Sequence, residues 1–163
     1  DRDVVVLGGG NSAVEEAIYL AGIARSVTVA VRSYLKADPI ACEKLRSLGN
    51  VTVLEGWEVS EFYGDTRLRG VRLKEKGTDG ERSLDCAQVF EYIGQIPATD
   101  CFRGLGVLND AGYVEVDAMM QTKVPGIFGA GDCVVKKLRQ VITACADGAI
   151  AAQSAAHYVQ SLK

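Results

Sequence analysis

A run of three glycines is the first feature of this sequence whose residue types and spacing could do chemistry. It lies in the segment VVVLGGGNSAVEEA, which contains the pattern Gly-x-Gly-x-x-Ala. In that pattern the first glycine permits a tight turn, the second lets the backbone approach a pyrophosphate, and the small third residue keeps a helix close to a strand. Backbone amides and the dipole at the start of the helix stabilise phosphate charge. The spacing therefore predicts a dinucleotide-binding turn formed by Gly8, Gly10, Asn11, Ser12 and Ala13.

The segments around this turn are those that must position it. Residues 4–7 are β-branched or leucine, which predicts a buried parallel strand, and residues 12–24 have helical spacing. A second strand is predicted over 26–32, a helix over 38–49 and a third strand over 50–56. This alternation of strand and helix is typical of one half of a parallel α/β sheet.

The next part of the chain has a different pattern. Three strand-like segments, EVSEFYG, LRGVRLKEKG and SLDCAQVFEYIG, are separated by Gly64-Asp65 and by the turn GTDG. They predict an antiparallel β-meander that returns to the sheet. We place a domain boundary near Pro97 and expect residues 1–97 to form a three-layer, Rossmann-like α/β domain.

Residues 98–163 are expected to form an incomplete second α/β segment. They contain a strand-like YVEVD at 113–117, an apolar strand VPGIFGAGD at 124–132 and an Ala-rich helix over about 138–159. An apolar parallel-type strand needs neighbours on both sides to satisfy its backbone. The segment is therefore predicted to be part of a domain.

The residues at the end of the second strand are expected to determine whether the protein prefers NAD or NADP. An acid there accepts hydrogen bonds from the ribose 2′-hydroxyl of NAD, whereas a cation meets the 2′-phosphate of NADP. The sequence has Arg32 at this place and no acid, and Lys36 follows as a second cation. The pattern favours NADPH over NADH.

Composition and charge exclude several other classes of protein. The chain is 48% hydrophobic with a net charge of −3 and no basic block, which argues against a nucleic-acid partner. Its apolar runs are strand-sized, so we expect no membrane association and a cytoplasmic location. Five cysteines without a C-x-x-C pair predict free thiols and neither a metal site nor a catalytic residue in this chain.

Five segments together resemble the thioredoxin reductase family of flavoproteins, which belongs to the pyridine nucleotide-disulfide oxidoreductases. They are GGGNSAVEEA, VRSYLK, YIGQIPAT, GIFGAGD and LRQVITACADGAIAA. Members of that family insert a central NADPH domain into an FAD domain built from both ends of the chain. The resemblance implies that residues 1–97 are the NADPH domain and that 98–163 are the returning half of the FAD domain.

The resemblance also implies cofactor contacts. Gly131 and Asp132 are expected to meet the pyrophosphate and ribityl region of FAD, and Arg139, Gln140 and Val141 the isoalloxazine end. In the NADPH domain it adds Glu16, Ile93 and Gly94 to the coenzyme contacts.

Two departures from the family pattern matter. Arg32 matches the first arginine of a His-Arg-Arg element, but Val31 and Ser33 replace its neighbours, which weakens the predicted preference for NADPH. The sequence also holds neither the flavin glycine turn nor the C-x-x-C pair that relatives have upstream. We therefore expect it to be a fragment of a longer protein and inactive alone.

The resemblance implies that the intact protein, a homodimer, passes electrons from NADPH through FAD to the disulfide of a thioredoxin-like protein. Two alternatives stay open. One is a ferredoxin–NADP reductase or NAD(P)H oxidase of the same fold without the dithiol. The other is a non-catalytic module that senses nucleotide.

Overall fold

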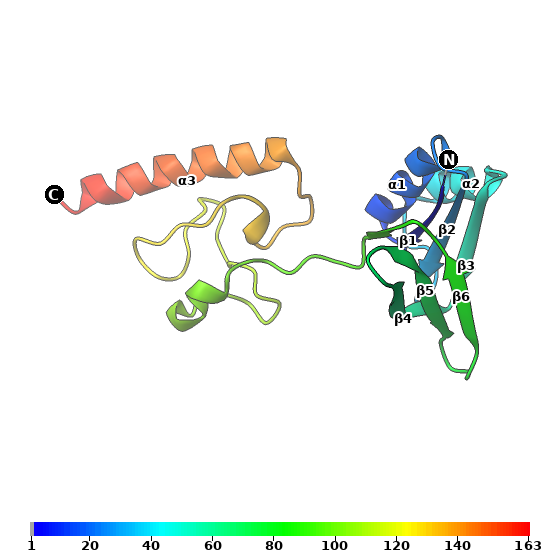
Figure 1. Ribbon diagram of the computed structural model, residues 1–163. Coiled ribbons are helices and arrows are strands. Elements are labelled where there is room, and N and C mark those ends of the chain that lie inside the picture. Colours follow the sequence, from blue (N-terminus) through cyan, green and yellow to red (C-terminus); the bar gives the residue numbers. More distant parts are fainter. Residues whose placement is uncertain (1) are drawn as a thin grey trace. The chain divides into compact units, whose positions relative to one another are not determined.

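The computed structural model describes residues 2–163 and divides the chain into two compact units (Figure 1). The first unit ends at Gly94, and the second runs from Gln95 to Lys163. The division lies just before Pro97, where the sequence places the domain boundary. Each unit has its own buried core.

The first unit is built on a four-stranded sheet in the order β3-β2-β1-β7, with every pair parallel. The predicted alternation of strands and helices is confirmed, and the meander does return to the sheet through β7. The bounds are β1 Asp3–Leu7, α1 Asn11–Ala21, β2 Ser26–Val31, α2 Pro39–Ser47, β3 Val51–Glu55 and β7 Gln88–Glu91.

The two faces of this sheet are covered by different elements, because successive side chains of a strand point to opposite faces. Val4 and Val6 of β1 belong to the core cluster that also contains α1 and α2 residues. Val5 and Leu7 pack with Val71 and Leu73 of the meander. The unit therefore has three layers: helices, parallel sheet and antiparallel sheet.

The antiparallel layer is a three-stranded sheet in the order β4-β5-β6. Its strands are β4 Trp57–Gly64, β5 Leu68–Glu75 and β6 Glu81–Asp85.

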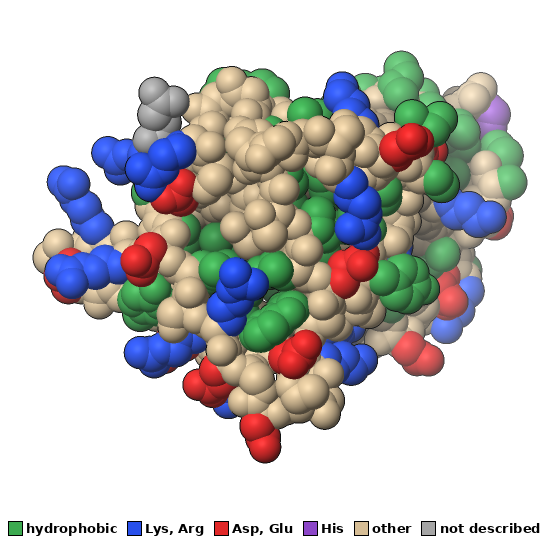
Figure 2. All heavy atoms as spheres, turned by 90° about the vertical axis from the view of Figure 1, so that its right-hand side faces the viewer, with side chains coloured by type: hydrophobic (Ala, Val, Ile, Leu, Met, Phe, Trp, Pro, Cys, Tyr) green, Lys and Arg blue, Asp and Glu red, His purple; other side chains and the backbone are tan. Residues whose placement is uncertain are grey.

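On the face of the molecule that Figure 2 shows, cationic and anionic side chains are interspersed, and the described side chains there form no continuous basic area.

Local signals explain where the two helices begin. Helix α1 starts directly after Gly10, which caps it in an extended conformation. Helix α2 starts at Pro39, and the side chain of Asp38 accepts a hydrogen bond from the backbone N–H of Ile40 at 2.9 Å. An acidic cap followed by proline is a favoured start of a helix. Helix α1 ends at Ala21, before the predicted position, in a tighter turn in which the backbone N–H of Gly22 donates to the carbonyl oxygen of Tyr19 at 3.1 Å.

The second unit contains α3 (Val141–Ser161) and two short 3₁₀ helices, η1 (Asp100–Leu105) and η2 (Gly131–Cys133). The predicted strands at 113–117 and 124–132 are wrong as strands. They form only isolated bridges, including those that join Val114 to Leu108 and to Val134. The physical reason is that no long partner strand satisfies their backbone within the described residues.

Helix α3 begins at Val141, later than the sequence predicts. The side-chain oxygen of Thr143 accepts a hydrogen bond from the backbone N–H of Gln140 at 3.2 Å, which defines Gln140 as the residue before the helix. Within residues 2–163, none of the helices combines the length and hydropathy needed to cross a membrane.

The contact between the two sheets of the first unit should carry much of its stability. Leu73 is fully buried there, whereas its neighbour Lys74 points to the other face. Replacing Leu73 with Ala removes buried methyl groups and leaves a cavity, so we expect the free energy of unfolding to fall by about 2–4 kcal/mol. Urea unfolding measures this, and Lys74→Ala is the matched control. Equal effects of the two substitutions would contradict the layered packing.

Candidate nucleotide-binding site

The glycine turn joins β1 to α1 at the carboxyl end of the parallel sheet. Gly8 has a φ of +133°, and a Cβ there would lie 2.3 Å from the carbonyl oxygen of Tyr92. Ala13 is fully buried against the sheet. A Cβ on Gly10, in contrast, would meet no atom within 4 Å. The turn is therefore closely packed on its inner side and open at Gly10.

The segment 32–38 after β2 is attached to this turn by two hydrogen bonds. The backbone N–H of Lys36 donates to the carbonyl oxygen of Gly9 at 2.7 Å. The backbone N–H of Asp38 donates to the side-chain oxygen of Asn11 at 2.8 Å. The structure thus brings the predicted coenzyme-selecting segment and the glycine turn together. It also gives Asn11 a structural role that the spacing did not predict.

The two predicted cations of this segment are exposed to solvent. The ammonium group of Lys36 lies 5.5 Å from the ring centre of Tyr34. Within the part of the chain that the structure describes, neither Arg32 nor Lys36 forms an ion pair. Their charge is therefore available to an anion.

An acid that is not among the predicted site residues, Glu55, lies beside this segment. Strands β2 and β3 are parallel neighbours, and Glu55 is in register with Val31. The carboxylate of Glu55 accepts hydrogen bonds from the backbone N–H of Leu35 at 3.0 Å and from Arg46 at 2.7 Å. The sequence signal was that Glu55 falls at the end of a predicted parallel strand, because the carboxyl ends of parallel strands meet at one edge of the sheet.

The end of β7 contributes to the same edge of the sheet. The backbone N–H of Tyr92 donates to the carbonyl oxygen of Leu7 at 2.7 Å, directly before the glycine turn. Burial, followed by the charge of Glu16, raises the pKa of the Tyr92 hydroxyl. Ile93 is exposed and Gly94 has a φ of +134°. The predicted contacts Glu16, Ile93 and Gly94 therefore lie near or directly after the residue that packs on Gly8.

A second group of predicted residues lies in the second unit, around η2. Gly131 has a φ of +82°, and its backbone N–H donates to the carboxylate of Asp147 at 3.1 Å. The same carboxylate oxygen accepts from the ammonium of Lys136 at 2.5 Å, and both side chains are largely buried. The hydrogen bond from Lys136 and that from Gly131 lower the pKa of Asp147, against the effect of burial.

This pair joins the turn of Gly131 to α3, and neither of its residues is among the predicted contacts. A single acid within an Ala-rich helix was the available signal, because an acid on a buried helix face needs a partner. Asp147 has that partner in Lys136, from the segment that connects the turn to the helix.

Arg139 lies over the predicted flavin residues of this turn. Its side-chain Nε donates to the carbonyl oxygen of Asp132 at 3.2 Å, and its guanidinium lies 4.3 Å from the ring centre of Tyr113. Asp132, Cys133 and Tyr113 line a hollow of about 440 Å³ together with residues 95–98. Gln140 and Val141 follow at the exposed start of α3. Tyr113, which the sequence pattern places in a predicted strand, instead packs against Arg139 here.

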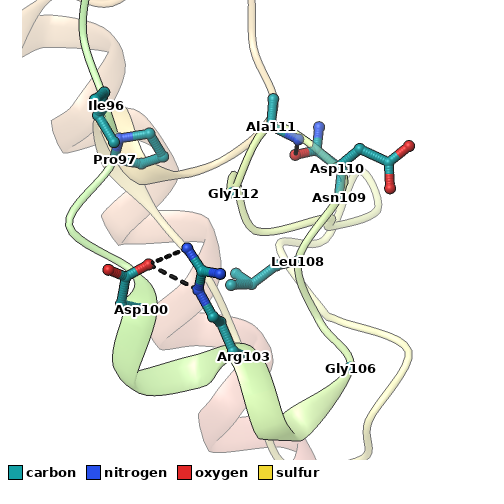
Figure 3. Close-up of a pocket in the computed structure, with 10 residues that line it drawn as sticks. All are labelled: Ile96, Pro97, Asp100, Arg103, Gly106, Leu108, Asn109, Asp110, Ala111 and Gly112. Atoms are coloured by element: carbon teal, nitrogen blue, oxygen red, sulfur yellow. Dashed lines mark hydrogen bonds and ion pairs between the residues drawn. The ribbon is translucent and has the colours of Figure 1, made fainter.

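Another hollow, of about 320 Å³, lies beside η1 (Figure 3). Asp100 and Arg103 form an ion pair on its wall, and the side chain of Asn109 accepts hydrogen bonds from the backbone N–H groups of Ala111 and Tyr113. None of the predicted cofactor residues lines it.

Neither a metal-binding cluster nor a disulfide is present among residues 2–163. No group of three or more His, Cys, Asp or Glu side chains could hold a metal ion there, and the cysteines are free. Burial and nearby acids raise the pKa of the Cys86 thiol, which disfavours its reactive thiolate form.

Gly8 and Gly10 should respond differently to the same substitution. Gly8→Ala places a methyl group against the Tyr92 carbonyl in a backbone conformation that favours glycine, so we expect the free energy of unfolding to fall by roughly 2–4 kcal/mol. Gly10→Ala fills open space and should leave it nearly unchanged. Denaturant unfolding of both variants measures the difference, and a larger loss for Gly10→Ala would contradict the assigned packing.

Replacing Lys136 with Met leaves the Asp147 carboxylate without its cation in a largely buried position. We expect the free energy of unfolding of the second unit to fall by about 1–3 kcal/mol, with the exposed Lys137→Met as the control. Because the pKa of Asp147 is lowered by folding, this contribution is complete above the ordinary value of 3.8 and is lost as the pH falls below it. Thermal unfolding followed by circular dichroism should therefore show the parent and variant converging at low pH; a constant gap would disprove the role of the pair.

Known proteins resemble this chain over nearly its whole length. A family model described as Pyridine nucleotide-disulphide oxidoreductase matches residues 1–148. A thioredoxin reductase from Bacillus subtilis is 43% identical over 99% of this chain and 52% of its own length. A protein named NADH dehydrogenase, from Ferdinandcohnia aciditolerans, is 42% identical over 97% of this chain and 31% of its own length.

A solved thioredoxin reductase structure also has the same fold as this chain. The crystal structure of Lactococcus lactis thioredoxin reductase in its FR conformation matches this chain with a TM-score of 0.89 and 34% sequence identity. The match covers 99% of this chain and 54% of the solved chain. The chain thus spans about half the length of the thioredoxin reductases it matches. The resemblance read from its motifs is confirmed: the chain belongs to the pyridine nucleotide-disulphide oxidoreductase family and is similar to its thioredoxin reductases.

Proposed function

We propose that the first unit binds NADPH across its glycine turn. The observation that carries this proposal is the contrast between the two glycines: Gly8 is packed against Tyr92, whereas Gly10 leaves open space directly before α1. A pyrophosphate can approach the backbone there and meet the free amides of the first helical turn, which include those of Ser12 and Ala13. The residues present therefore fit a dinucleotide.

Arg32 and Lys36 are proposed to recognise the 2′-phosphate. Both lie on the segment that is hydrogen-bonded to the glycine turn, and both have exposed side chains that form no ion pair within residues 2–163. A cation at the end of the second strand favours NADP over NAD because it offsets the phosphate charge. Glu16, Ile93 and Gly94 are proposed as further contacts at the same edge.

We infer that the second unit is one part of an FAD-binding domain. Asp132, Arg139, Gln140 and Val141 come together at the turn before α3, and Gly131 is fixed there by Asp147. Val141 and Ile142 are 81% and 74% exposed, so the start of this helix presents apolar surface to whatever covers it. An isoalloxazine ring offers an apolar surface with polar edges that suits this set of side chains.

For the intact protein we propose the activity of a flavin-dependent disulfide reductase of the thioredoxin reductase type. When bound, the flavin would accept hydride from NADPH and pass electrons on to a disulfide. The substrate would be a thioredoxin-like protein, and the protein would act as a homodimer in the cytoplasm, where its thiols stay reduced. This activity requires a C-x-x-C pair elsewhere in the polypeptide, and a parent sequence without one would contradict it.

The coenzyme assignment can be tested with the 163-residue chain by calorimetric titration of NADPH and NADH. We expect Arg32→Ala to weaken NADPH binding about tenfold, because it removes a charge-assisted contact to the 2′-phosphate, and to leave NADH binding nearly unchanged. Arg67→Ala, in the turn between β4 and β5, is the matched control. Gly10→Ala should weaken both coenzymes.

Two results would contradict the assignment. Equal loss of NADPH and NADH affinity in Arg32→Ala would mean that Arg32 does not meet the 2′-phosphate. Unchanged binding of both coenzymes by Gly10→Ala would place the pyrophosphate elsewhere.

A further inference from the structure

The segment that carries Arg32 and Lys36 is held on both of its sides. On one side, the backbone of Lys36 is hydrogen-bonded to Gly9. On the other side, the carboxylate of Glu55 accepts from the backbone N–H of Leu35 at 3.0 Å. A hydrogen bond to a charged acceptor is stronger than one between neutral groups, so this contact restrains the middle of the segment.

The position of Glu55 is itself fixed by neighbouring elements. It is the last residue of β3 and is in register with Val31 of β2. Arg46 of α2 donates to the same carboxylate oxygen at 2.7 Å. The backbone N–H of Gly56 donates to the carbonyl oxygens of Val31 and Ser33, at 2.8 and 3.1 Å. Glu55 and Gly56, at the end of β3 and directly after it, therefore bind the backbone at Val31, Ser33 and Leu35.

The charge of Glu55 has a further consequence for an anionic ligand. A free carboxylate next to Arg32 would repel a 2′-phosphate. Here the oxygen that binds Leu35 is also paired with the guanidinium of Arg46, so the local field is largely balanced. The acid can therefore order the segment without cancelling the positive charge of Arg32 and Lys36.

We propose that Glu55 is a positioning residue that sets the choice between NADPH and NADH. It acts through the backbone of Leu35, which lies between the two cations, and fixes where they meet the 2′-phosphate. This inference rests on the proposed binding of NADPH by the glycine turn. It assigns a specificity role to a residue of a strand that contributes no side chain to the predicted coenzyme contacts.

The consequence is a change in the ratio of the two affinities. Arg32 and Lys36 serve only the 2′-phosphate, whereas the glycine turn serves the pyrophosphate of both coenzymes. Loss of Glu55 should therefore weaken NADPH binding and spare NADH binding. The Gln variant keeps a side-chain oxygen that can accept from Leu35, so it should retain most of the preference.

The test is calorimetric titration of NADPH and NADH into the 163-residue chain and into Glu55→Ala, Glu55→Gln and Glu61→Ala. Glu61 is the matched control because it forms an ion pair with Arg72 on the antiparallel sheet. We expect Glu55→Ala to weaken NADPH binding about fivefold to tenfold and NADH binding by less than about twofold. Glu55→Gln should lie close to the parent, and Glu61→Ala should match it. Thermal unfolding confirms that each variant is folded.

Three outcomes would overturn the proposal. If Glu55→Ala weakens both coenzymes equally, Glu55 has only a structural role. If Glu55→Gln binds NADPH more tightly than the parent does, the acid acts by repulsion. If Glu55→Ala leaves both affinities unchanged, the tether does not matter. Failure of the proposed function looks different: the parent chain itself would bind neither coenzyme, or Arg32→Ala would leave its NADPH affinity unchanged.

Discussion

The edge of the parallel sheet that carries the glycine turn depends on the absence of a side chain at Gly8. The chain turns there with a φ of +133°, and the carbonyl oxygen of Tyr92 occupies the place where a Cβ would be. Because of this close approach, β7 pairs with β1 up to the turn, and α1 can start directly after Gly10. The open space at Gly10 and the packed position of Ala13 both follow from that geometry.

A second constraint is the attachment of the segment after β2 to this turn. Backbone groups of Lys36 and Asp38 are bonded to Gly9 and Asn11, while Glu55 holds the other side. The exposed side chains of Arg32 and Lys36 therefore extend from a backbone segment that is restrained by hydrogen bonds on two sides. Affinity gained from such side chains is larger when the backbone that carries them is ordered before the ligand binds.

In the second unit, a largely buried ion pair fixes the turn that carries the predicted contacts. Among the described residues 95–163, the buried members of its core cluster are Val107, Val114 and Val134, so apolar packing alone gives it limited support. The carboxylate of Asp147 binds both Lys136 and the backbone of Gly131, and thereby fixes the turn to α3. An acid that looks misplaced in an Ala-rich helix is thus the residue that orders the predicted flavin contacts.

The sequence by itself determined the alternation of strands and helices before Gly94, the glycine turn and the family, because these depend on local spacing and on residue types that few other structures require. Only the tertiary structure showed that the strands expected near 113–117 and 124–132 form isolated bridges, since strands need partners that local pattern does not reveal. It alone brought Glu55 beside Leu35 and Asp147 beside Gly131. Such contacts join residues far apart in the chain, and their geometry is decided by strand register and helix placement.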